Sequence, residues 1–335
     1  MSNSDQIQKS ATIALFTSGV QNHRISPVLS TGFEPADRHE SAPVAQQEND
    51  AVGRFAVAMP FILIALFAIV RGEDADTYYH LGLGRWIVEH LKVPSTDPFS
   101  YLSQGAFTDS HWLFQVLSYL TWRAGGFSAL ILIQAAAFLA ACILLYRSVR
   151  PLGLCIVFSA LLLVAAAPIA YRMTLRPDMA TIFFIAAYWY QLFGWRQDTT
   201  TQPRENALTW KTIILITGMQ ALWVNLHGLY PIGLVLVFCK IAGETFTHNV
   251  PVPAGWKQRA DTATPASRLW LMGTLAIAAC FINPNGVNTF LHSGKIYMET
   301  THNAAEFVKT IREMESPFAL DLVGAQKVTA VSYKI

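Results

Sequence analysis

The stretch FSALILIQAAAFLAACILLY, residues 127–146, contains no charged side chain from end to end. A helix needs about 20 apolar residues to cross the hydrocarbon core of a bilayer, so this stretch predicts a membrane-spanning helix. Six more apolar runs predict further spans, at 55–70, 152–171, 180–195, 212–224, 229–243 and 269–282. The fold class predicted is therefore all-α, a polytopic membrane protein with about seven transmembrane helices.

The overall composition supports this class. Hydrophobic residues make up 53% of the chain and charged residues 14%, whereas soluble domains carry about 25% charged residues. A net charge of +2 is too small to indicate a nucleic-acid partner. The cysteines lie inside apolar runs without metal-like spacing, which favours small buried apolar side chains, and they are Cys142, Cys155, Cys239 and Cys280.

The distribution of basic residues orients the predicted spans. Arginines and lysines follow the second, fourth and sixth apolar runs, and short positive loops face the cytoplasm. We therefore expect a multi-pass protein of the cytoplasmic (inner) membrane with a cytoplasmic N-terminus. Residues 1–50 read as a disordered cytoplasmic tail, 51–290 as the transmembrane module with its first extracytoplasmic loop at 71–126, and 291–335 as an extracytoplasmic C-terminal segment.

The first extracytoplasmic loop is patterned rather than featureless. Apolar residues at helical spacing predict one surface helix over 77–91, whose N-terminus Asp76 or Thr77 can cap. An aromatic-rich stretch over 111–122 predicts a second surface helix. The glycines at 125–126 separate this second helix from the next span.

Polar residues border the extracytoplasmic ends of several spans, where ionisable groups are costly and tend to be functional. Asp74 and Asp76 are candidate general bases, or ligands of a divalent cation, although Asp76 could serve only as a helix cap. Arg172 and Arg176 lie four residues apart, and on one helix both could bind a phosphate or anchor to lipid headgroups.

Two further polar clusters lie on the same predicted side. His227, in the sequence WVNLHG with Asn225, could donate to a phosphate or sugar oxygen, or be satisfied by backbone. Residues 283–286, NPNG, read as a turn that closes the seventh span. The polar residues inside the apolar runs are few, chiefly Gln134, Ser159 and Gln220. The chain has no Walker loop, no GxGxxG after a strand, no HExxH and no GxSxG motif.

Several of these motifs together resemble the membrane-embedded GT-C glycosyltransferases, specifically the bacterial branch with a DxDTxxHLxxGRWI first loop. The matching stretches are DADTYYHLGLGRWI at 74–87, VPSTDPFS at 93–100, SHWL at 110–113, RP at 176–177, NLHG at 225–228, NPNG at 283–286 and EMESP at 313–317. Leu102 stands where the branch has a threonine, and Met314 where it has a tryptophan.

The resemblance implies sugar transfer from a polyprenyl-phosphate donor outside the cytoplasm. By this resemblance Asp74 or Asp76 acts as base or metal ligand, and a divalent cation is the one cofactor it suggests. The substrate-binding residues implied are His80, His111, Arg172, Arg176, Asn225 and His227. Many members of the family are longer, with further spans and a periplasmic domain.

Two other classes of function stay open on the sequence. A lipid-linked sugar translocase would need polar residues near the middle of the spans, where this chain has few. A non-catalytic protein of envelope-polysaccharide assembly would keep the architecture without the activity. The sequence leaves the sugar, the acceptor and the oligomeric state undetermined.

Overall fold

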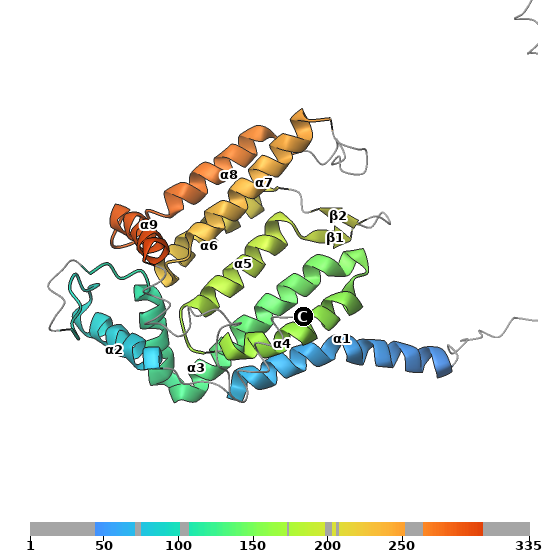
Figure 1. Cartoon of the computed structure of the whole chain (residues 1–335), viewed down its shortest axis with the longest axis horizontal. Coiled ribbons are helices and arrows are strands. Elements are labelled where there is room, and N and C mark those ends of the chain that lie inside the picture. The colour runs from blue at the N-terminus through green and yellow to red at the C-terminus, as the bar shows by residue number, and fades with distance from the viewer. Residues whose placement is uncertain are drawn as a thin grey trace, which may run out of the picture. The chain divides into compact units, whose positions relative to one another are not determined.

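A computed structural model describes residues 44–70, 75–100, 107–172, 174–197, 203–205, 208–251 and 264–303. Apart from the start of its first helix, this part of the chain belongs to one unit, Glu48–Ile335. Its helices are α1 Val44–Val70, α2 Ala75–His90, α3 Trp112–Val149, the 3-10 helix η1 Arg150–Leu152, α4 Cys155–Arg172, α5 Asp178–Leu192, α6 Trp210–Leu226, α7 Pro231–Asn249, α8 Ala266–Ala279 and α9 Val287–His302 (Figure 1). A short antiparallel ribbon joins α5 to α6, formed by β1 Trp195–Gln197 and β2 Pro203–Glu205.

The all-α class is confirmed, and most of each of the seven apolar runs lies in a helix. Helix α1 begins at Val44, inside the stretch predicted as a disordered tail, while residues 1–43 lie outside the described part. Helix α9 falls at the boundary with the predicted C-terminal segment and was not predicted. The ribbon between α5 and α6 was not predicted either.

Within the described residues, one helical stretch, Trp112–Leu152, is both long and apolar enough to cross a membrane. Three other apolar helices are shorter, at Gly53–Ile69, Cys155–Ala166 and Ala266–Ala279. One such helix is weak support for a membrane protein, so the multi-pass arrangement stays a prediction.

Helix α3 is two helices joined at a sharp kink. The backbone leaves the helical region at Gly125 (φ −150°) and at Gly126 (φ 64°). A positive φ favours glycine because other residues clash there. The predicted separation between the 111–122 helix and the following span is therefore confirmed.

The core gathers where α5, α6, α7 and α8 pack together, with α3 against α5. Phe184 stacks on Trp223 at a centroid distance of 5.2 Å, and both side chains are buried. The core also contains a series of linked hydrogen bonds. The Tyr188 hydroxyl donates to Gln220 Oε1 at 2.7 Å. Gln220 Nε2 in turn donates to the Tyr230 carbonyl at 3.1 Å. Both the oxygen and the nitrogen of the buried Gln220 amide are therefore hydrogen-bonded, as most buried polar groups are.

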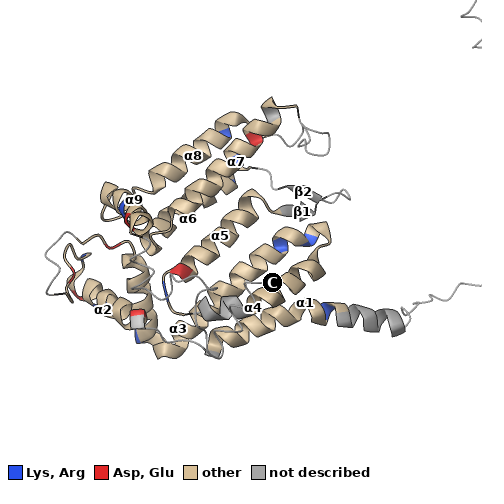
Figure 2. Ribbon diagram, viewed as in Figure 1, with Lys and Arg blue, Asp and Glu red and all other residues tan. Residues whose placement is uncertain are grey.

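The other polar residues of the apolar runs also turn inward. Gln134 and Ser159 are buried. Lys240 is a further member that the sequence analysis left out, and its buried ammonium lies 3.2 Å from the equally buried carboxylate of Glu244, one helical turn on in α7. In contrast to α7, helices α5 and α6 carry almost no charged residues between their ends (Figure 2).

Gly84 allows α2 to lie directly on the N-terminal part of α3. A Cβ atom added to Gly84 would fall on the backbone carbonyl of Gln115 and close to Tyr119 Cβ. Backbone cannot move aside as a flexible side chain can. The glycine of the GRW sequence is therefore explained by close helix packing.

Gly84→Ala is expected to lower the free energy of unfolding by about 1–3 kcal/mol, because it overpacks this contact. Thermal unfolding of the purified chain measures the effect. Gly218→Ala in α6 is the matched control, since a Cβ there meets nothing within 4 Å and alanine favours a helix by about 1 kcal/mol. Equal unfolding temperatures for the two variants would contradict the account.

Candidate functional site

Helix α2 is joined to the start of α5 by two contacts. A guanidinium nitrogen of Arg176 lies 3.3 Å from Asp76 Oδ2. The Thr77 hydroxyl, fully buried, donates to the Leu175 carbonyl at 3.4 Å. The Asp76 side chain is 58% exposed and that of Arg176 is 21% exposed. An acid from the first loop and an arginine from a later turn therefore meet at a place that a ligand can reach.

Asn225 ties the end of α6 to two further chain segments. Its Oδ1 accepts from Trp112 Nε1 at 2.7 Å, at the start of α3. Its Nδ2 donates to the carbonyls of Ala221 at 2.7 Å and Ile282 at 2.8 Å, the latter just beyond α8. Asn225 is itself at the end of α6 and buried. These bonds bring the start of α3 and the ends of α6 and α8 to one region of the molecule.

Three histidines form a row beside these contacts. The rings of His80 and His111 are 6.0 Å apart between centroids, and those of His111 and His227 are 5.2 Å apart. His227 Nδ1 lies 2.6 Å from the Thr181 hydroxyl, which also accepts from Trp223 Nε1 at 3.0 Å. Since the indole nitrogen can only donate, the threonine hydrogen is available to His227 Nδ1.

Burial keeps two histidines of this row, His111 and His227, neutral. Desolvation, together with the neighbouring imidazoles, lowers the pKa of His111 to about 3. Desolvation and His80 lower the pKa of His227 to about 4. Both imidazoles are therefore uncharged near neutral pH, when each can donate one hydrogen bond and accept another.

Asp109 belongs to the same region and was missed by the sequence analysis. It is 2% exposed, and its Oδ1 accepts from the His111 backbone N–H at 2.8 Å and from Gln115 Nε2 at 3.1 Å. Its Oδ2 is buried with no hydrogen-bond partner among the described residues. Burial raises the pKa of Asp109 to about 6. The signal was an aspartate two residues before a histidine at a helix start, a common turn that accepts backbone N–H groups.

The carbonyl of Asp109 connects this network to the NPNG turn. Asn285 Nδ2 donates to that carbonyl at 3.0 Å. Asn283 Nδ2 donates to the Cys280 carbonyl at 2.8 Å, and Asn283 Oδ1 accepts from Asn285 N at 2.9 Å. The predicted turn after the seventh apolar run is therefore confirmed, and it braces the loop that carries His111.

The condition for the predicted arginine pair, that both residues lie on one helix, is not met. Arg172 is the last residue of α4, whereas Arg176 lies in a bend before α5. Pro177 follows Arg176, and a residue before proline is disfavoured in a helix. The two arginines therefore do not share one helix at a four-residue spacing. The side chain of Arg172 lies outside the described structure.

The remaining predictions for the first loop have mixed outcomes. Arg85 and Glu89, which the four-residue spacing places on one face of the helix, form a pair, with Arg85 Nε donating to Glu89 Oε1 at 2.7 Å. Helix α2 begins at Ala75, so Asp76 lies inside its first turn rather than at the cap. Asp74 lies outside the described residues. The prediction that the cysteines are buried holds for Cys142 and Cys280, whereas Cys155 is half-buried and Cys239 is exposed.

The possible metal site stays a prediction. In the part of the chain that the structure describes, no group of three or more His, Cys, Asp or Glu side chains is placed to hold a metal ion. Since Asp74 lies outside that part, its role as a ligand beside Asp76 is untested.

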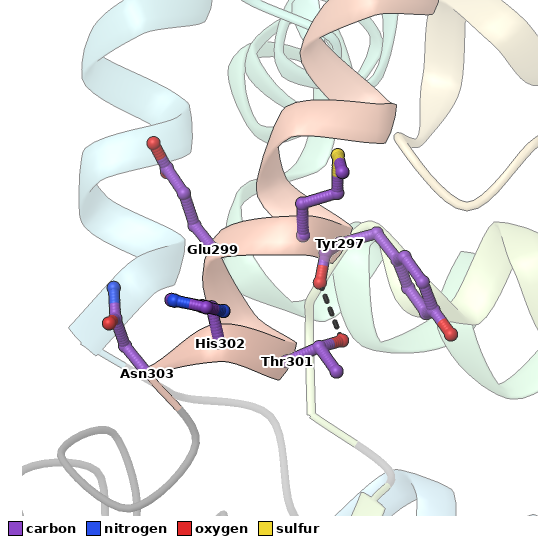
Figure 3. A pocket seen from close by; sticks show the side chains of 6 residues that line it. Tyr297, Glu299, Thr301, His302 and Asn303 are labelled. Atoms are coloured by element: carbon purple, nitrogen blue, oxygen red, sulfur yellow. Dashed lines mark hydrogen bonds between the residues drawn. The ribbon is translucent and has the colours of Figure 1, made fainter.

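An open hollow of about 500 Å³ lies at the end of α9. Figure 3 shows its lining, which consists of Tyr297, Met298, Glu299, Thr301, His302 and Asn303. The Thr301 hydroxyl donates to the Tyr297 carbonyl at 2.7 Å, within the helix. The hollow adjoins the point where the described chain ends, and it holds none of the predicted site residues.

Acidification is expected to destabilise the chain through its buried histidines. His227 and His111 would take up protons near pH 6.5 when unfolded but only near pH 4 and pH 3 when folded. The unfolded state therefore binds more protons as pH falls below 6.5, and the unfolding temperature drops.

Asp109 acts in the opposite direction, because its folded pKa is about 6 and its ordinary value is 3.8. Its contribution to stability is present at low pH and is lost as pH rises through 6. Asp109→Asn should therefore steepen the loss between pH 6.5 and pH 4, and His227→Asn should flatten it. Unfolding temperatures over this range test both variants, and unchanged pH profiles would contradict the assignment.

Comparison of the chain with protein-family models, with curated proteins and with solved structures finds no match. The resemblance to GT-C glycosyltransferases therefore rests on the motifs in the sequence.

Proposed function

We propose that the chain is an integral membrane glycosyltransferase. It moves a sugar from a polyprenyl-phosphate carrier to a glycan, lipid or protein acceptor of the cell envelope, on the extracytoplasmic side. The observation that carries the proposal is the 3.3 Å contact between Asp76 and Arg176, which unites the first-loop acid motif with the RP motif at an accessible point. These two motifs belong to the set on which the family resemblance rests.

The two side chains suit the two chemical tasks of a glycosyl transfer, which are deprotonation of the acceptor hydroxyl and stabilisation of the departing phosphate. A carboxylate can accept the proton of the acceptor hydroxyl as its oxygen bonds to the anomeric carbon of the sugar. The bond from that carbon to the phosphate oxygen breaks, and the electron pair leaves on the phosphate. A guanidinium binds phosphate through charge-assisted hydrogen bonds and stabilises the departing charge. Asp76 and Arg176 take these roles.

The neutral histidines have a supporting part in this scheme. An uncharged imidazole donates one hydrogen bond without adding a fixed charge. His111 and His227, with rings 5.2 Å apart, lie in the region that Asn225 connects. They can bind sugar or phosphate oxygens while Asp76 stays the acceptor of the proton.

The outward faces of several helices support a membrane location. In α4, Ile156 is 67% exposed and Leu161 is 65% exposed, while Ser159 between them is buried. Water disfavours large exposed apolar surfaces, and they mark sites of contact with membranes or partners. Polar side chains inside and apolar side chains outside is the arrangement that lipid favours.

The experiment is donor consumption by the full chain in proteoliposomes, with a panel of polyprenyl-phosphate sugars that carry a labelled sugar. A transferase consumes at least one donor and releases polyprenyl phosphate. A translocase moves the labelled lipid between leaflets without consuming it, and an assembly protein does neither. Folded chain that consumes no donor in the presence of envelope acceptors would contradict the proposal.

A further inference from the structure

Helix α9 has an apolar stripe that faces away from the rest of the described structure. Leu291 is 62% exposed, Tyr297 is 73% exposed and Met298 is 71% exposed. Residues spaced by three, four and seven positions lie on one face of a helix. The exposed apolar residues with this spacing are Val287, Phe290, Leu291, Tyr297 and Met298. They form one continuous stripe, named here the α9 stripe.

A second side of α9 is fixed against the candidate site. Thr289 is buried, and its hydroxyl donates to Asn283 Oδ1 at 2.7 Å. The Ser293 hydroxyl donates to the Gly228 carbonyl at 3.2 Å, next to His227. These bonds set the rotation of the helix about its own axis. The α9 stripe therefore cannot turn inward without breaking them.

The flank of the helix is polar. Lys295 Nζ lies 3.6 Å from Glu299 Oε1, and both side chains are exposed. His292 lies near this flank, and desolvation lowers its pKa. Helix α9 thus combines an apolar face with a charged side, which is the pattern of a helix that lies in a membrane interface.

The α9 stripe continues onto the outer surface at the end of α8. The rings of Phe290 and Phe281 stack at a centroid distance of 6.2 Å. Phe281 and Ile282 are themselves exposed. The apolar surface therefore passes without interruption from the predicted seventh span onto α9.

We infer that α9 lies in the headgroup region of a lipid bilayer, with the α9 stripe against the acyl chains and Lys295 and Glu299 toward water. The occupant is lipid because the stripe is continuous with the apolar face of a predicted span and is flanked by charge. Through Ser293 and Thr289 the helix then holds Gly228 and the NPNG turn at headgroup depth. That is the level at which a lipid-linked phosphate lies. The inference rests on the membrane location in the proposed function.

The test is photo-crosslinking of the full chain in vesicles of phosphatidylethanolamine and phosphatidylglycerol. A p-benzoylphenylalanine residue replaces Leu291, Met298, Lys295 or Ile156 in separate variants, each checked by its unfolding temperature. Ile156 is the reference for lipid contact on α4, and Lys295 is the matched polar control on α9. We expect lipid adducts at Leu291 and Met298 in several-fold excess over Lys295.

The reference position, Ile156, distinguishes failure of the inference about α9 from failure of the membrane location itself. Lipid adducts at Ile156, with Leu291 and Met298 joined to a second copy or to another segment of this chain, would overturn the inference for α9 alone. Absence of lipid adducts at Ile156, Leu291 and Met298 together would overturn both this inference and the membrane location. Equal lipid yield at Lys295 and Leu291 would also overturn it, because the stripe would not be the face in contact.

Discussion

Trp223→Ala is expected to lower the free energy of unfolding by about 3–5 kcal/mol, the usual cost of truncating a buried tryptophan. Trp223 is fully buried in α6. Its ring stacks on Phe184 with an interplanar angle of 18° and lies edge-on to Tyr188 at 5.7 Å. Truncation leaves a cavity that these rigid rings fill only in part.

Trp223→Ala also removes a hydrogen bond that positions a residue of the candidate site. Trp223 Nε1 donates to the Thr181 hydroxyl, and that hydroxyl contacts His227 Nδ1 at 2.6 Å. Trp223→Phe keeps an aromatic ring but loses this donor, so it should cost about 1 kcal/mol from the hydrogen bond alone. The ranking of the two variants separates packing from hydrogen bonding.

Thermal or denaturant unfolding of the purified chain measures both variants. The control is Trp270→Ala in α8, where the side chain is 58% exposed. Its loss should change the unfolding free energy far less. If Trp223→Ala unfolds at the same temperature as Trp270→Ala, the described core is wrong at this point.

Asp76→Asn is expected to reduce sugar transfer by about 10²–10⁴-fold, the range for loss of a general base. Asparagine has nearly the same shape but cannot take a proton from the acceptor hydroxyl. The stability of the chain should hardly change, because the Asp76–Arg176 pair is partly exposed and such pairs contribute about 0–1 kcal/mol.

Glu89→Gln is the matched control for Asp76→Asn. Glu89 is an exposed acid on the same helix, α2, and it pairs with Arg85 rather than with Arg176. Its substitution should leave transfer unchanged. Turnover is measured in proteoliposomes at matched unfolding temperature, and equal turnover by the two variants would remove Asp76 from the mechanism. Asp74→Asn belongs beside them, since the sequence motif contains both acids.

The helices could be predicted because their apolar residues are consecutive. Residues 127–146 and 212–224 form helices as expected, and Gly125 and Gly126 break α3 where predicted. Helix α9 was not predicted because its apolar residues line one face of the helix and are separated in the sequence by polar residues such as Lys295, rather than forming a consecutive run. Such a stripe has meaning only once the helix is known to be there.

That the polar clusters lie together could be expected because all were predicted on the same side of the membrane, but their individual contacts could not. Asp76 meets Arg176, and Asn225 links α3 to α8, as convergence on one side requires. The role of Thr181 depends on a tertiary contact that no local pattern contains. Asp109 was not predicted as a site residue because its unusual feature is its burial, which its spacing in the sequence does not reveal.

The central claim is that Arg176 and its neighbours receive a lipid-linked phosphate. The direct measurement is the affinity of the full chain in vesicles for polyprenyl phosphate and for polyprenol, which lacks the phosphate, in wild type and in Arg176→Gln. Wild type should bind polyprenyl phosphate more tightly than polyprenol, and Arg176→Gln should weaken the binding of polyprenyl phosphate by about tenfold or more, the loss of a charge-assisted hydrogen bond. Equal affinity of wild type for the two lipids, or an unchanged affinity in Arg176→Gln, would contradict it.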